Sequence, residues 1–243
     1  MNARILTALF ACSLTVTACG EEADTPAEPE APFPAFATVV RGPLADGAKD
    51  IHDMIAAGGQ EAATEAGDLS HDALVSTALL GGDEGHFLGI DQWADAEAMG
   101  QFYSDPAFAE GLGAMFAGPP TVTTYARAAD WHGWGELDSA DDAGDYWFVV
   151  AAGTLAQPAD DAQPLHDMLA AGGEGQAKAA GDVAHVVFLG LEDRQQFMAI
   201  DVWRSSEAIE AFYGNPDFQM GFASLFAGPP TVTVYRSTDW HQW

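Results

Sequence analysis

Two ten-residue stretches of the sequence, FAGPPTVTTY at 116–125 and FAGPPTVTVY at 226–235, differ at a single position. Further matches join the same two halves of the chain: FLGIDQW at 87–93 with FMAIDVW at 197–203, GDLSH at 67–71 with GDVAH at 181–185, and DWHGW at 130–134 with DWHQW at 239–243. Matches that run through so much of each half indicate a duplicated domain. We therefore predict one repeat over residues 36–135, an acidic linker over 136–145 and a second repeat over 146–243.

Each repeat predicts the order strand, helix, strand, strand, helix, strand. The first helix is indicated by apolar residues at i, i+3 and i+4: Ile51, Met54 and Ile55 in one repeat and Leu165, Met168 and Leu169 in the other. The second helix is interrupted by a proline, and the double proline of FAGPP ends it before the last strand. This βαββαβ order is the ferredoxin-like plan, an α+β fold with its helices on one face of the sheet.

The other face of such a sheet would be a large bare apolar surface, which soluble proteins rarely leave uncovered. Two repeats in one chain can cover each other by packing sheet against sheet. Together with the F-Y-x-x-P-x-F helix at 102–108 and 212–218 and the V-x-V-Y strand at 232–235, this arrangement resembles the dimeric α+β barrel superfamily. That superfamily includes the antibiotic-biosynthesis monooxygenases and the stress-responsive A/B barrel proteins. The resemblance implies a pseudo-dimeric barrel made by one chain.

The N-terminal residues predict export rather than folding. Arg4 precedes a short apolar run, and Val16-Thr17-Ala18-Cys19 is similar to the lipobox of bacterial lipoproteins. We predict a signal peptide over 1–18, lipidation at Cys19, and a disordered acidic, Pro-rich tether over 19–35. An ordinary signal peptide cut at a nearby small residue is the alternative. The expected location is the cell envelope, at the outer membrane or in the periplasm.

The acidic composition of the chain excludes some classes of binding partner. The chain has 37 acidic against 8 basic residues, a formal net charge of −29, which repels nucleic acid and anionic lipid surfaces. We therefore expect no nucleic-acid partner and membrane contact only through Cys19. A small molecule is the expected ligand. Removal of Cys12 with the signal peptide would leave Cys19 alone, so no internal disulfide is expected.

Strand alternation brings an acid onto an aromatic face. Phe197, Ala199, Asp201 and Trp203 share one side of the third strand, as Phe87, Gly89, Asp91 and Trp93 do in the first repeat. We expect this side to face the barrel interior, with Met198, Ile200 and Val202 packed on the helices. Asp91 and Asp201 are then buried carboxylates, which serve as bases or ligand anchors. A structural hydrogen bond to an indole or a backbone N–H is the alternative.

Three histidines recur at matching places: His52 and His166, His71 and His185, His132 and His241. An Asp–His pair is a general-base arrangement, so the candidate catalytic residues are Asp91, Asp201, His71 and His185. The candidate ligand-binding residues are Trp93, Trp203, Phe87, Phe197, His52, His166, Tyr103 and Tyr213. Trp131, Trp134, Trp240 and Trp243 are predicted to anchor strand ends on the opposite repeat. A hydrogen-bonded structural role is the alternative for each histidine.

No close-spaced ligand motif such as H-E-x-x-H is present, so we predict no metal site and no cofactor. The resemblance leaves haem open, since members of the superfamily bind it, and the repeated His and Asp residues leave a divalent metal open. Three functions compete: cofactor-independent oxygenation of an aromatic or polyketide-like molecule, non-catalytic ligand binding in the envelope, and metal or haem binding.

Overall fold

The structure is a computed structural model that describes residues 33–137 and 146–243. The predicted signal peptide, Cys19, nearly all of the tether and most of the linker lie outside the described residues. None of the helices within the described ranges has the length and apolar character needed to cross a membrane.

The first half (residues 36–135) contains four strands and three α-helices. Its elements are β1 (Phe36–Pro43), α1 (Ala48–Ala66), β2 (Asp68–Ser76), a 3₁₀ turn η1 (Leu79–Gly81), β3 (His86–Trp93), α2 (Ala96–Tyr103), α3 (Pro106–Gly113) and β4 (Thr121–Arg127). The predicted second helix is two helices because Pro106 begins a new one, as a proline can at the first helical position.

The second half (residues 146–243) repeats this order without the 3₁₀ turn. Its elements are β5 (Trp147–Thr154), α4 (Ala159–Ala180), β6 (Asp182–Gly190), β7 (Gln196–Trp203), α5 (Ser206–Tyr213), α6 (Pro216–Ala223) and β8 (Thr231–Ser237). Ser205 and Asp95 cap the matching helices α5 and α2 by accepting the N–H of Ala208 and Ala98. The four extra residues of the first half lie between β2 and β3.

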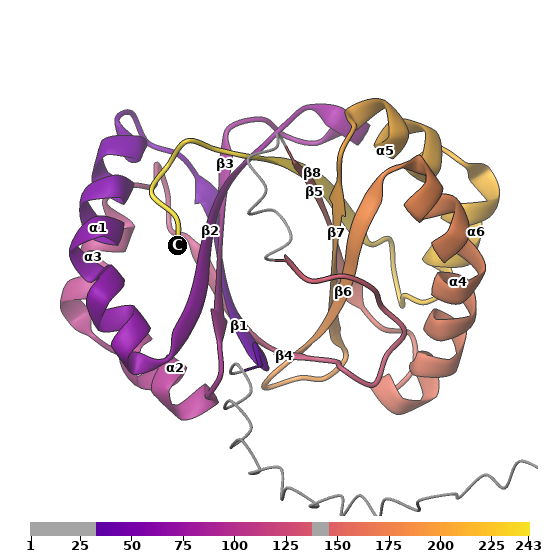
Figure 1. Cartoon of the computed structure of the whole chain (residues 1–243), viewed down its shortest axis with the longest axis horizontal. Coiled ribbons are helices and arrows are strands. Elements are labelled where there is room, and N and C mark those ends of the chain that lie inside the picture. Colours follow the sequence, from indigo (N-terminus) through magenta and orange to yellow (C-terminus); the bar gives the residue numbers. More distant parts are fainter. Residues whose placement is uncertain (1–32, 138–145) are drawn as a thin grey trace, which may run out of the picture. The chain divides into compact units, whose positions relative to one another are not determined.

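The eight strands close into one barrel in the order β1-β3-β2-β8-β5-β7-β6-β4 (Figure 1). Each half contributes a ferredoxin-like sheet, β4-β1-β3-β2 and its repeat. The halves join edge to edge, where β2 pairs with β8 and β4 pairs with β6, all antiparallel. Closure leaves neither sheet with an open edge. The predicted α+β class and the pseudo-dimeric barrel are confirmed.

The barrel interior is the largest apolar core, and it corrects our assignment of strand faces. Met198, Ile200 and Val202 lie inside it with Leu88 and Ile90 from the other half. The opposite face carries two aromatic and acidic sets, which lie under the helices: Phe87, Gly89, Asp91 and Trp93 on β3, and Phe197, Ala199, Asp201 and Trp203 on β7. Period-two alternation separated the faces correctly but did not say which one the helices cover.

The reason lies in the side chains of α1 and α4. Their buried positions are mostly small, and each helix carries an Ala-Ala-Gly-Gly run, at 56–59 and 170–173. Helices with so little side-chain volume need large residues opposite them, and the strand aromatics supply that volume. Met54 and Met168, which we placed on the buried stripe, are 69% and 62% exposed.

A crossing segment follows the last strand of each half and lies against the other half. The first crossing segment, residues 128–137, lies along β6, where Ala128 N–H donates to the Val187 carbonyl. The second, residues 238–243, leaves β8 and ends beside α1 and β2 (Figure 1). There His71 N–H donates to the Trp243 carbonyl at 2.8 Å. The tryptophans of both segments therefore reach across to the opposite half.

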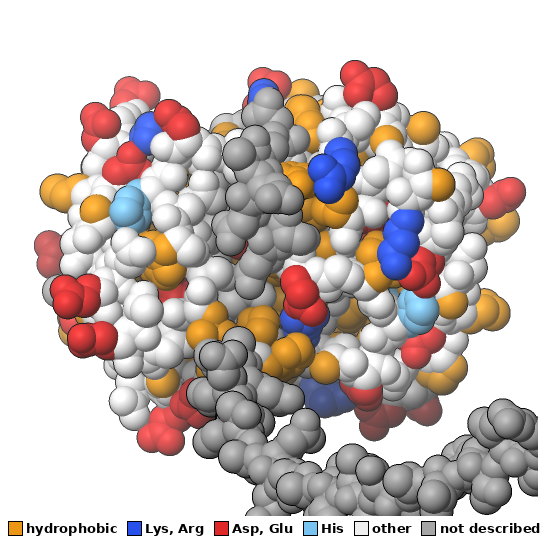
Figure 2. Space-filling model, in the orientation of Figure 1, with side chains coloured by type: hydrophobic (Ala, Val, Ile, Leu, Met, Phe, Trp, Pro, Cys, Tyr) orange, Lys and Arg blue, Asp and Glu red, His pale blue; other side chains and the backbone are white. Residues whose placement is uncertain are grey.

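Acidic side chains are scattered over the face shown in Figure 2 and do not gather into one patch, while Lys and Arg side chains are few there. This distribution accords with the net charge of −29.

Candidate functional site

Strand register places a histidine beside each buried aspartate. His185 on β6 lies directly opposite Asp201 on β7, and His71 on β2 lies opposite Asp91 on β3. His185 Nδ1 is 2.5 Å from Asp201 Oδ1, and His71 Nδ1 makes the same contact with Asp91. Both aspartates are only 6% exposed. A carboxylate in this position fixes the tautomer and the orientation of the imidazole.

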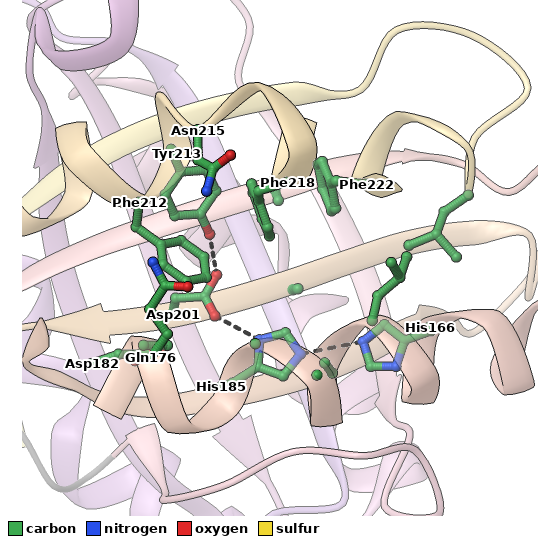
Figure 3. Close-up of a pocket in the computed structure, with 18 of the residues that line it drawn as sticks. His166, Gln176, Asp182, His185, Asp201, Phe212, Tyr213, Asn215, Phe218 and Phe222 are labelled. Atoms are coloured by element: carbon green, nitrogen blue, oxygen red, sulfur yellow. Dashed lines mark hydrogen bonds and ion pairs between the residues drawn. The ribbon is translucent and has the colours of Figure 1, made fainter. Parts of the chain in front are cut away.

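Each pair extends into a longer chain of hydrogen bonds. Tyr213 donates its hydroxyl to Asp201 Oδ2, as Tyr103 does to Asp91 (Figure 3). On the other side, His185 Nε2 lies 3.2 Å from His166 Nε2, on α4. This series of hydrogen bonds ends at the next residue of α4, where His166 Nδ1 is 3.0 Å from Asp167 Oδ1.

The first half contains the same series of hydrogen bonds between the same atoms. His71 Nε2 is 3.0 Å from His52 Nε2, and His52 Nδ1 is 3.2 Å from Asp53 Oδ1. We call the two imidazoles the histidine pair of each half: His52 with His71, and His166 with His185.

Counting protons gives the charge of a fully hydrogen-bonded histidine pair. The two contacts with carboxylates each need an N–H, and the contact between the two Nε2 atoms needs one more. Four ring nitrogens then carry three protons, one more than two neutral imidazoles hold. A pair with every contact made therefore bears one positive charge between two carboxylates. Its neutral form lacks the proton between the Nε2 atoms.

The pKa shifts place that charge on the strand histidine in the first half. Burial lowers the pKa of His52 to about 4, and it lowers that of His166 to about 4 as well. Burial also opposes the charging of His71, but Asp91 outweighs it and raises the pKa of this imidazole. His52 is accordingly the neutral partner, which accepts at Nε2 and donates from Nδ1 to Asp53.

Each crossing segment donates a further hydrogen bond to the hydrogen-bonded series of the opposite half. Asp167 Oδ1 accepts the N–H of His132 at 2.8 Å, and Asp53 Oδ1 accepts that of His241 at 2.8 Å. Trp134 lies over His185 with ring centroids 4.8 Å apart, and Trp243 lies over His71 at 4.6 Å. Each site is therefore built from both halves of the chain.

The second half encloses a cavity of about 320 Å³ between its sheet and its helices. Polar groups of the hydrogen-bonded chain form one wall, and Phe212, Phe218 and Phe222 lie around it (Figure 3). The lining also includes Trp134, Phe197, Gln176 and Asn215. A concave, mostly apolar site with a few convergent polar groups is the usual form of a small-molecule pocket.

The matching cavity in the first half measures only about 50 Å³. Val40 lies where the second half has Ala151, since both follow their strand starts by four residues and line their cavities. Leu112 replaces Phe222 and Met115 replaces Leu225 at the far end. The two halves thus share their polar chain but differ in the room beside it.

Most predicted site residues meet at these two cavities. Asp91, His71, His52, Phe87 and Tyr103 line the first; Asp201, His185, His166, Phe197 and Tyr213 line the second. Trp93 and Trp203 line neither. They are fully buried behind the sites, where Trp203 packs on Phe212 with ring centroids 5.3 Å apart.

Sequence reasoning missed several residues of the sites. Asp68 and Asp182 are buried carboxyls, only 3% and 4% exposed, that line the cavities. Asp53 and Asp167 hold the helix histidines. Their signals were present in the sequence, because GD-x-x-H at 67–71 matches 181–185 and H-D-M at 52–54 matches 166–168. His132 and His241 contribute their backbone N–H groups rather than their rings.

The histidine pairs offer no ligand set for haem or for a metal ion. Axial ligation of haem iron requires a ring nitrogen that is free to bond it, yet in the fully hydrogen-bonded form all four ring nitrogens of each histidine pair are engaged. Within residues 33–137 and 146–243, no group of three or more His, Cys, Asp or Glu side chains is placed to hold a metal ion. The residues as arranged do not fit either group.

No protein-family model and no curated protein matches the sequence. Solved structures do match the fold: a proposed monooxygenase from Lactobacillus acidophilus NCFM has a TM-score of 0.57 at 10% identity, covering 85% of this chain and 95% of that chain. The chain has the dimeric α+β-barrel fold. A proposed monooxygenase from Fusobacterium nucleatum has a TM-score of 0.58 at 8% identity, covering 86% of this chain and 96% of that chain.

An anthrone oxidase-like protein matches with a TM-score of 0.57 at 17% identity, covering 87% of this chain and 93% of that chain. Each of these matches covers more than one half of the present chain, so the likeness includes both parts of the barrel. At such identities the likeness concerns the fold alone.

Proposed function

We propose that the second half binds a small aromatic or polyketide-like molecule and oxygenates it without a cofactor, beginning with removal of a proton. One observation carries the proposal: a hydrogen-bonded Asp–His–His–Asp chain lines an apolar cavity of about 320 Å³. Cavities of this size are at the lower end of those that enclose small organic ligands. The aromatic walls favour a flat ring system.

The histidine pair supplies the base. In its neutral form the pair lacks the proton between His166 and His185, and a proton taken from a bound molecule restores the complete chain. Two flanking carboxylates, Asp167 and Asp201, stabilise the resulting charge. The carbanion left on the substrate then reduces O₂. For an activated CH₂ group the balance is CH₂ + O₂ → C=O + H₂O, with the abstracted proton returned to the departing water.

The two proposed monooxygenases and the anthrone oxidase-like protein among the structural matches support this choice of reaction class. Anthrone is a suitable probe, because its CH₂ group lies between two aromatic rings and opposite a carbonyl. We expect residues 33–243 to consume O₂ and to form anthraquinone from anthrone in metal-free buffer. Oxygen uptake and absorbance measure the two sides of that balance.

The duplicated chain offers a matched control for this test. His185→Gln should lower the rate at least a hundredfold, since general bases typically contribute that much or more. His71→Gln removes the equivalent imidazole beside the cavity of about 50 Å³ and should leave the rate within twofold. Equal losses in the two variants, or an unchanged rate in His185→Gln, would contradict the proposal. Melting temperatures confirm that each variant is folded.

Non-catalytic ligand binding is the second candidate, and the fully engaged ring nitrogens favour it. A pair that stays protonated cannot accept a proton, yet the cavity beside it can still hold an aromatic molecule. Binding of anthrone with no oxygen uptake from pH 6 to pH 9 would support this function over oxygenation.

We also propose that the protein is exported and held in the cell envelope through lipid on Cys19. The lipobox-like Val16-Thr17-Ala18-Cys19 supports this. Cys19→Ser should move the protein from the membrane fraction to the soluble fraction of its host. Wild-type protein that is already soluble would contradict the proposal.

A further inference from the structure

Asp182 lies in the second cavity because β6 is irregular. Asp182 and His185 are three residues apart, so in a regular strand they would face opposite sides of the sheet. The register shifts between Asp182, which pairs with Trp203, and Ala184, which pairs with Val202. This β-bulge turns Asp182 to the helix side, where it lines the cavity with His185. The same shift between Asp68 and Ser70 brings Asp68 into the first site.

Asp182 has few groups to stabilise a negative charge. The residue is 4% exposed, and its Oδ1 accepts the N–H of Ala184 at 3.2 Å. In the described parts of the chain, no Lys, Arg or His forms an ion pair with it. Burial raises the pKa of Asp182 to about 9, and the charge of Asp201 adds to the effect. The Ala184 N–H, Trp134 and Lys178 oppose it only in part.

The cavity thus holds two carboxyl groups in different states. Asp201 accepts from Tyr213 and His185, which are contacts of a carboxylate. The raised pKa of Asp182 implies that this buried carboxyl group is protonated at neutral pH and can donate a hydrogen bond. Two carboxyls whose surroundings separate their protonation states take separate roles, one ionic and one as a hydrogen-bond donor.

We propose that Asp182 is the polar anchor of the cavity, donating a hydrogen bond from its carboxyl group to a carbonyl or enolate oxygen of the ligand. The inference rests on the proposed function, from which it takes an aromatic ligand. It adds that Asp182 recognises an oxygen atom of that ligand. A donor there stabilises the negative charge that the ligand gains when the histidine pair removes a proton. The expected ligand is therefore an aromatic ketone or a related enolisable molecule, and not a hydrocarbon.

Equilibrium binding of two probes tests the anchor without any turnover. The probes are 1-tetralone and tetralin, which share a ring system and differ in one carbonyl oxygen. Calorimetry at pH 7 should show that residues 33–243 bind 1-tetralone about tenfold more tightly than tetralin, as one added hydrogen bond implies. Equal affinities, or no binding of either probe, would overturn the proposal.

Two variants show whether Asp182 acts as a hydrogen-bond donor or as a negative charge. Asp182→Leu removes the donor but keeps the branching of the side chain, and it should abolish the preference for 1-tetralone while leaving tetralin binding within threefold. Asp182→Asn keeps a donor, so it should retain most of the preference. The wild-type preference should decline above about pH 9, where Asp182 ionises, whereas that of Asp182→Asn should persist. Loss of the preference in Asp182→Asn at pH 7 would overturn the donor role.

Asp68→Leu is the matched control, since the first cavity of about 50 Å³ is too small for either probe. It should leave both affinities unchanged, and a loss equal to that of Asp182→Leu would overturn the assignment to the second half. Because these measurements need no reaction, a retained preference alongside absent oxygen uptake would contradict the proposed oxygenation while supporting the anchor.

Discussion

The free energy of unfolding of residues 33–243 is expected to fall by about 5 kcal/mol between pH 6.5 and pH 8.5. The cause is burial, which raises the pKa of both Asp68 and Asp182 to about 9. Over this range the folded protein holds two protons that the unfolded chain has released. Each such proton costs about 1.4 kcal/mol of stability per pH unit.

Histidine side chains also affect how the free energy of unfolding depends on pH. His52 and His166, with pKa values lowered to about 4, are neutral in both states above pH 6.5 and add no slope there. Between about pH 4 and pH 6.5 the unfolded chain protonates these two imidazoles, so stability rises with pH by an amount that offsets the two aspartates. His71, whose pKa is raised, adds to the loss above pH 6.5. A plateau followed by a decline is therefore expected.

Denaturant unfolding at half-unit pH steps measures this curve. The double variant Asp68→Asn, Asp182→Asn preserves the shape of the protonated groups and removes their titration, so most of the decline should disappear. A wild-type stability that is flat or rises from pH 6.5 to pH 8.5 would show that the two carboxyls are ionised in the folded protein.

The repeated sequence and its resemblance to the dimeric α+β barrel superfamily together predicted the barrel. Two copies of a βαββαβ order leave two bare sheet faces, and in one chain the simplest cover for each is the other. The prolines at 106 and 216 and the FAGPP stretches set helix ends through local backbone chemistry, which does not depend on the rest of the fold. Such features can be predicted from sequence because their physical causes are local.

The orientation of the sheet could not be predicted this way. Alternation on β7 separates Met198 and Ile200 from Phe197 and Asp201, but both sets are apolar enough to face either layer. The deciding fact is the small volume of the Ala-Ala-Gly-Gly runs on α1 and α4, which has meaning only once those helices are docked. Packing between the helices and the sheet therefore determines which face of the sheet the helices cover.

The composition of each site was also beyond local reasoning. The bulge that brings Asp182 beside His185 is a register shift between two strands, and periodicity counted along one strand assigns Asp182 to the wrong face. The sixfold difference between cavities of about 320 and 50 Å³ arises from small substitutions such as Ala151 for Val40. Shared motifs showed that the halves correspond, but not that only one of them has room for a ligand.

The crossing segments lead to the last prediction: a residue of the first half should control binding in the second. Trp134 follows β4 in sequence, yet it lines the cavity of about 320 Å³ and lies over His185. Trp134→Ala should weaken 1-tetralone binding about tenfold, since a stacked aromatic contributes about that much to an apolar contact. Calorimetry on residues 33–243 measures the loss.

Trp134→Ala should preserve the backbone pairing of the crossing segment with β6. Trp134 and His185 exchange two backbone hydrogen bonds, N–H to carbonyl, at 3.1 and 2.8 Å, and alanine keeps both. Trp243→Ala is the control, because Trp243 lies over His71 beside the smaller cavity. It should lower the melting temperature but leave 1-tetralone affinity unchanged. If instead Trp243→Ala weakens binding and Trp134→Ala does not, the ligand occupies the first half, and the crossing segment of residues 238–243 closes its site.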